Sequence, residues 1–125
     1  MHANLIAGWV GFLAGGVAGA IPGLFFHKEK WLGGYDSWER RLIRLAHIAF
    51  FGIGLINILF AISAQMLNID DGVKASSILL IIGAVTMPLV CYLAAWKPIA
   101  RNLFFIPAGS VIVGSALFVW RMINV

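Results

Sequence analysis

The stretch LIAGWVGFLAGGVAGAIPGLFF, residues 5–26, decides the fold because it contains no charged side chain. As an α-helix it would be about 33 Å long, and the hydrocarbon core of a bilayer is about 30 Å thick. Three further apolar runs follow at about residues 45–67, 78–96 and 103–120, and each is long enough to cross a membrane with modest tilt. The sequence therefore predicts an all-α membrane protein whose four transmembrane helices form an up-down bundle.

The composition is typical of a membrane protein and not of a water-soluble domain. Of the 125 residues, 62% are hydrophobic and 11% are charged, so the chain lacks the polar side chains that a small soluble domain needs on its surface. The single cysteine, Cys91, cannot form a disulfide within the chain. We expect one transmembrane domain over residues 1–125, with the lipid bilayer as its surroundings.

The basic residues predict how the chain is oriented in the membrane. The net charge is +4, but the basic residues lie between the apolar runs and form no continuous stripe, so we expect no binding to nucleic acid. Most of them fall on one side of the predicted bundle: Lys28, Lys30, Arg40, Arg41, Arg44, Lys97 and Arg101. Only Lys74 and Arg121 fall on the other side. Because basic loops tend to stay in the cytoplasm, the pattern predicts an inner-membrane protein with both termini on the non-cytoplasmic side.

The first apolar run could also be read as a cleaved signal peptide, since it begins near the start of the sequence. No Lys or Arg precedes it, however, and it is longer than the apolar part of a typical signal peptide. We therefore expect the first helix to be retained.

The most polar part of the chain is the connection of residues 27–44, which we call the elbow and which the charge pattern assigns to the cytoplasm. Gly33 and Gly34 interrupt local order. Asp36 followed by Glu39 resembles a capping box that would start an amphipathic helix at the membrane surface. The elbow is suited either to anchoring a partner or to forming an interfacial aromatic belt. The side chains concerned are Trp31, Tyr35, Trp38, Arg40, Arg41 and Arg44.

Four glycines recur at intervals of four residues in the first predicted helix: Gly11, Gly15, Gly19 and Gly23. Such a row makes a shallow groove along one side of a helix, which another backbone can approach closely. The groove predicts contact with the second or fourth helix of the same chain, or with another membrane subunit. A flat cofactor such as haem is a further candidate for the groove.

His47 is the only histidine within a predicted transmembrane segment, where an ionisable side chain is costly. One interpretation is a b-type haem ligated by His47, for which Gly54 would leave room beside the imidazole. His27 or Met87 would then be the second ligand. The alternative is a neutral imidazole that hydrogen-bonds to Tyr92, to a backbone carbonyl or to another subunit.

Asn57 lies near the middle of the second predicted helix, where an unpaired amide would be costly. Its expected partners across the bundle are Thr86, Ser110 and Ser115. A small-solute transporter or channel would use this polar set together with helix breaks at prolines. The prolines concerned are Pro22, Pro88 and Pro107. The transmembrane segments contain no Asp, Glu, Lys or Arg to couple ions, which argues against transport.

The sequence contains no enzyme motif. It has no pair of intramembrane carboxylates, no HExxH pair, no phosphate-binding loop and no GxSxG elbow, so we expect no catalysis by this chain. The glycine row and the elbow instead favour an auxiliary or structural subunit of a larger inner-membrane complex, with a respiratory or other electron-transfer complex as the expected host. The haem-binding membrane cytochrome and the small-solute transporter are the alternatives.

Overall fold

The computed structural model describes all 125 residues, and its regular elements are all helices. The four long helices are α1 (His2–Gly23), α2 (Trp38–Met66), α3 (Lys74–Trp96) and α4 (Phe105–Ile123). Two short 3₁₀ segments, η1 (Trp31–Gly33) and η2 (Pro98–Leu103), lie in the connections. Each long helix, the last together with η2, is long and apolar enough to cross a membrane. The fold is therefore that of a four-helix, multi-pass membrane protein.

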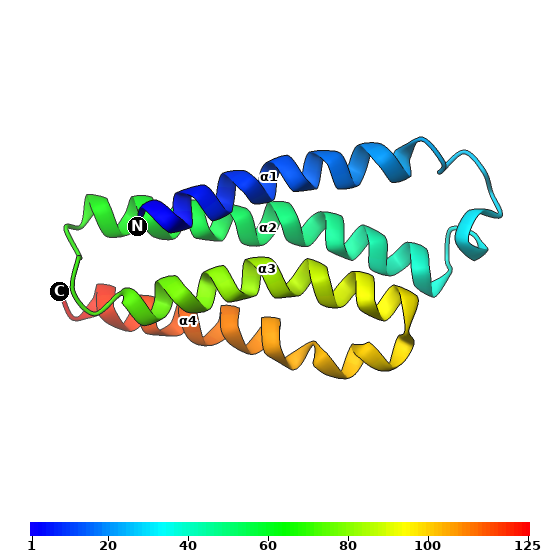
Figure 1. Cartoon of the computed structure of the whole chain (residues 1–125). Helices are drawn as coiled ribbons and strands as arrows, with labels where there is room; N and C mark the ends of the chain where they lie inside the picture. Colours follow the sequence, from blue (N-terminus) through cyan, green and yellow to red (C-terminus); the bar gives the residue numbers. More distant parts are fainter.

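Consecutive helices run in opposite directions and pack side by side in chain order (Figure 1). α2 and α3 form the middle of this row, while α1 and α4 lie at its two edges; α1 also contacts α3. Both termini lie at one end of the molecule, beside the α2–α3 turn, and the elbow and η2 lie at the other end. The strongly basic connections are therefore together at one end.

The main difference from the predicted helix boundaries is the start of α2. The apolar run placed the membrane-spanning part from about residue 45, and the Asp36–Glu39 pattern predicted a helix start in the elbow; α2 begins at Trp38, so the polar segment before the membrane is helical. Its N-cap is Ser37 and not Asp36: the Ser37 hydroxyl accepts a hydrogen bond from the Arg40 backbone N–H at 3.2 Å. The 29 residues of α2 span about 44 Å, so the helix is longer than the hydrocarbon core is thick.

The three prolines named in the transporter hypothesis lie at different places in the helices. α3 continues through Pro88, whereas α1 ends at Gly23, one residue after Pro22. Pro107 lies in the first turn of α4, where the backbone N–H that proline lacks would have had no partner within the helix. Of the three prolines, only Pro88 therefore has several turns of α-helix before it and about two after it.

The main hydrophobic cluster lies toward the end of the molecule that carries the termini. There the rings of Phe60 from α2 and Phe118 from α4 meet edge to face, with their centroids 4.7 Å apart. Leu80 of α3 packs against them, and Ile69 and Val73 from the α2–α3 turn close the cluster. This cluster fixes α4 against α2 and α3.

Candidate functional site

The best-connected polar group inside the bundle joins α1, α2 and α3. The Asn4 side-chain nitrogen donates to Asn57 Oδ1 at 2.8 Å and to the Ser77 carbonyl at 3.2 Å. The Ser77 hydroxyl in turn donates to Asn4 Oδ1. The Asn57 nitrogen donates to the carbonyls of Ile53 and Leu80, each at 3.0 Å. Both asparagines are fully buried, so these bonds supply the partners that their amides need away from water.

The predicted partners of Asn57 were therefore wrong. Thr86 donates to the Ile82 carbonyl at 2.6 Å, and Ser110 donates to the Ile106 carbonyl at 2.7 Å, so both hydroxyls are satisfied within their own helices. Ser115 lines a shallow cavity between α2 and α4. The polar group contains no ionisable side chain, and its evident role is to hold three helices in register.

The glycines of α1 face α2 of the same chain. An added Cβ would come within 3.0 Å of α2 at Gly11, 2.7 Å at Gly15 and 2.6 Å at Gly19. Gly8, which the predicted row left out, is the tightest of these positions at 2.4 Å, whereas Gly23 has open space around it. The face that contacts α2 therefore includes Gly8 in place of Gly23, because alternating spacings of three and four follow a helix face more closely than a constant four.

His47 packs against this glycine face. Its Nε2 would lie 2.6 Å from a Cβ added at Gly19, and the ring of Phe51 meets the imidazole edge to face at 5.3 Å. Gly54, which the haem hypothesis used as open space, is buried beneath α1, with the Phe12 ring 3.4 Å from the position of an added Cβ. α1 thus fills the room that was assigned to a macrocycle.

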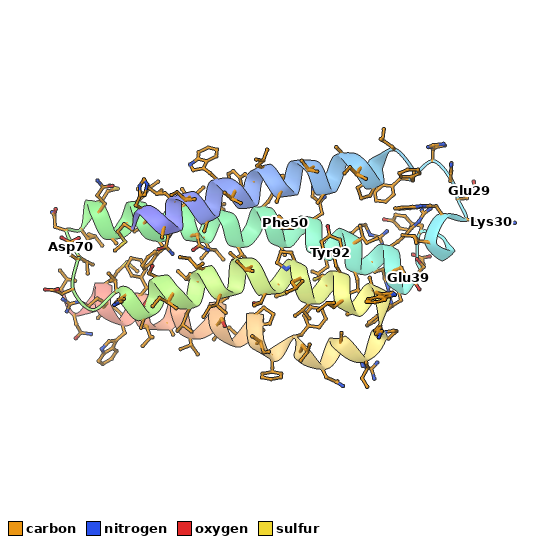
Figure 2. All side chains as sticks on the ribbon, in the orientation of Figure 1. Glu29, Lys30, Glu39, Phe50, Asp70 and Tyr92 are labelled. Atoms are coloured by element: carbon orange, nitrogen blue, oxygen red, sulfur yellow. The ribbon has the colours of Figure 1, made fainter.

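The other predicted neighbours of His47 lie elsewhere. His27 is exposed in the turn that follows α1, and Met87 is half-buried on α3. Tyr92 packs its ring against Phe50, with centroids 6.4 Å apart (Figure 2), and does not hydrogen-bond to His47. The reason is that α1, and not α3, covers the imidazole. The structure contains no group of three or more His, Cys, Asp or Glu side chains arranged to hold a metal ion.

The elbow is folded around Arg40, of which only 3% is exposed. Its Nε donates to the Trp31 carbonyl at 2.6 Å, and one of its Nη atoms donates to the Lys28 carbonyl. The guanidinium carbon also lies 5.4 Å from the centroid of the Trp31 ring and 5.7 Å from that of Phe26. Arg40 therefore satisfies two backbone carbonyls of the turn and makes cation–π contacts with the rings of Trp31 and Phe26.

The remaining elbow side chains also hold local structure. The Trp38 indole N–H donates to the Ala94 carbonyl at 2.8 Å, which ties the start of α2 to the end of α3. Arg44 donates to the Tyr35 carbonyl at 3.0 Å and lies 4.3 Å from the centroid of the Tyr35 ring. Arg41 is exposed and lies 6.0 Å from the centroid of the Trp38 ring. The structure thus separates Arg41, which faces outward, from Arg40 and Arg44.

An apolar groove of about 230 Å³ remains open between α1 and α3. Its walls include small residues, Ala7, Gly11 and Ala14 from α1 and Ala84 from α3, and Phe50 of α2 also lines it. Spacings of four and three place the three α1 residues on one helix face. Such a surface lets the side chains of another helix approach the backbone closely.

Sequence reasoning missed Asn4 and Gly8, although a signal for both was present. Asn4, Gly8, Gly11 and Gly15 are spaced by four, three and four residues, which is the pattern of one continuous helix face. Because the predicted helix began at residue 5, Asn4 lay outside it, and the four residues were not recognised as one helix face.

No known protein-family model matches this chain, and no solved structure matches it significantly.

Proposed function

We propose that this chain is an auxiliary, structural subunit of a larger membrane complex and that it binds a partner helix through the groove between α1 and α3. The groove supports the proposal because four of its seven lining residues, Ala7, Gly11, Ala14 and Ala84, are small. Lipid tails are as apolar as leucine, so helices associate in a membrane through close packing of small residues and through polar contacts. A groove with small walls is the surface that such packing needs.

The exposure of α1 also supports this proposal. Only Asn4, Gly8 and Gly15 of this helix are buried, and its main contacts with other long helices are with α2 and α3. One further helix lying against both α1 and α3 would cover the groove. The proposed partner is therefore a transmembrane helix with a side-chain ridge that fits about 230 Å³.

The charge distribution supports an orientation with the elbow in the cytoplasm. Five basic residues in the elbow and two beside η2 lie at one end, against Lys74 and Arg121 at the other. By the positive-inside rule, we propose an inner-membrane location with both termini on the non-cytoplasmic side.

The test is co-purification from the native membrane in a mild detergent, comparing two small-to-leucine substitutions on α1. Ala14→Leu fills the groove and should abolish the association. Gly16→Leu adds similar bulk where an added Cβ meets nothing within 4 Å, so it should leave the association intact. Gly15 is unsuitable for this test because an added Cβ there meets Phe51 of the same chain at 2.7 Å.

Isolation of the wild-type chain as a lone 13.6 kDa monomer from gently solubilised membranes would overturn the proposal. So would equal co-purification of the Ala14→Leu and Gly16→Leu variants. Mass spectrometry of the co-purified subunits identifies the host, which we propose to be a respiratory or other electron-transfer complex.

A further inference from the structure

A separate cavity, of about 280 Å³, opens at the elbow end of the molecule. Four side chains line it: Phe26, Tyr35, Arg40 and Arg44. Two of the four carry guanidinium groups, and none is a carboxylate. The acidic residues of the elbow, Glu29, Asp36 and Glu39, are not part of the lining; Figure 2 shows Glu29 and Glu39 at this end of the molecule. The cavity therefore has a concentrated positive charge.

Both guanidinium groups are held in place and still have unused donors. Arg40 and Arg44 are one turn apart on α2, so they lie on the same face of the helix. A guanidinium has five N–H donors. Arg40 gives two of them to backbone carbonyls, and Arg44 gives one to the carbonyl of Tyr35. The other N–H donors of both side chains make no hydrogen bond within the chain. A planar guanidinium can donate two parallel hydrogen bonds to the oxygens of a phosphate group.

The burial of Arg40 makes an anion favourable at this place. Its hydrogen bonds all go to neutral carbonyls, so a charge that is 3% exposed has no carboxylate among its hydrogen-bond partners. A buried charge without an opposite charge is costly. The N-terminus of α2, at Trp38, adds a positive partial charge from the helix dipole.

The depth of the cavity indicates where the anion comes from. Residues 45–66 of α2 are already about 33 Å long, enough to cross the hydrocarbon core. Arg40 and Arg44 precede this segment, so they lie at the level of the lipid headgroups. Phe26 gives the cavity an apolar wall from the chain that follows α1.

We propose that this cavity binds the phosphate group of an anionic membrane lipid, with the Arg40 and Arg44 guanidinium groups as donors to the phosphate oxygens. The site does not depend on the partner-binding groove, which lies between α1 and α3 and is lined by different residues. A variant can therefore lose lipid binding and keep subunit association, or lose subunit association and keep lipid binding.

The experiment measures the thermal unfolding of the purified chain in a neutral detergent with added phosphatidylglycerol, diacylglycerol or inorganic phosphate. Phosphatidylglycerol should raise the midpoint, whereas diacylglycerol, which lacks the phosphate, should not. Arg44→Gln should weaken the apparent affinity for phosphatidylglycerol about tenfold, the order expected for losing a hydrogen bond between charged groups. Arg41→Gln removes the same charge three residues earlier, outside the cavity, and should bind as the wild type does.

Three outcomes would overturn the proposal. Equal loss in Arg41→Gln and Arg44→Gln would mean diffuse charge attraction, and equal stabilisation by diacylglycerol would mean that the acyl chains alone bind. Stabilisation by inorganic phosphate as strong as by the lipid would assign the cavity to a soluble anion. If Arg44→Gln does not fold, Arg44→Lys keeps the charge but loses the planar guanidinium, and its affinity for phosphatidylglycerol should be lower than that of the wild type; an unchanged affinity would count against the site.

Discussion

Asn57 shows how much one buried amide contributes to the packing of this molecule. It accepts a hydrogen bond from Asn4 and donates to two backbone carbonyls. Asn57→Leu removes all three bonds and leaves the Asn4 nitrogen with one partner instead of two. We expect the free energy of unfolding to fall by about 1–2 kcal/mol, as measured by reversible denaturation in mixed micelles.

Thr86→Val is the matched control for this experiment. The Thr86 hydroxyl bonds only to a carbonyl of its own helix, so its loss should change the free energy of unfolding by less than about 0.5 kcal/mol. If Asn57→Leu were as stable as the wild type, the polar group would not be holding the three helices together.

Arg40 makes a separate prediction about the elbow. Arg40→Met keeps much of the side-chain volume but removes the donors to the Lys28 and Trp31 carbonyls. The turn also contains Leu32 in the left-handed region, at φ 50°, which costs a side chain roughly 1–2 kcal/mol. Amide hydrogens of residues 28–34 should therefore exchange about tenfold faster in Arg40→Met, measured by hydrogen–deuterium exchange.

Arg41→Met is the control for the exchange experiment because Arg41 is exposed and makes no hydrogen bond to the turn. Unchanged exchange in Arg40→Met would show that the turn holds its shape without the guanidinium.

At the level of single residues, the sequence predicted which side chains need a partner better than it predicted the partner. Burial depth follows from position along an apolar run, so Asn57 and His47 could be identified as costly residues. Their partners depend on how each helix is rotated and shifted against its neighbours. In the structure, this register places Asn4 beside Asn57 and Gly19 beside His47. The spacing of residues within one helix does not determine the register between two helices.

Among the elements, the contact between α1 and α2 tolerates little change. At Gly8, an added Cβ would lie 2.4 Å from Ile58 Cγ1 and 2.6 Å from the backbone oxygen of Gly54. The backbone oxygen cannot move aside without moving α2. Gly8→Ala should therefore lower the free energy of unfolding by about 1–3 kcal/mol, measured in mixed micelles.

Gly23→Ala provides the comparison on the same helix, since an added Cβ there meets nothing within 4 Å. Its stability should be equal to or slightly above that of the wild type, because alanine has the higher helix propensity. Similar losses in the two variants would mean that the effect comes from the backbone of α1 and not from its contact with α2.

The four spans themselves were predictable because hydrocarbon selects long apolar helices. The apolar run alone did not predict the start of α2; the capping-box pattern placed it in the elbow, although with Asp36 and not Ser37 as the cap. Once Ser37 caps the first turn, the charged residues from Glu39 to Arg44 can remain helical while their side chains reach the headgroup layer. Capping chemistry, and not hydropathy, set this boundary.

For the molecule as a whole, the antiparallel row of helices separates two ends of different charge. Figure 2 shows Glu29 at the elbow end and Asp70 at the end that carries the termini. In a chain that carries Cys91→Ala, a single cysteine at either of these exposed positions reports which side of the membrane it faces. The positive-inside rule predicts labelling of Asp70→Cys by a membrane-impermeant maleimide in intact cells.

Glu29→Cys should be labelled only after the membrane is permeabilised. The reverse pattern would place the basic elbow outside, and the proposed phosphate site would then face the outer headgroup layer. Labelling of both positions in intact cells would mean that α2, the long helix between them, does not span the membrane. Because α2 is the only long helix between the elbow and Asp70, this pair of sites tests directly whether α2 crosses the membrane.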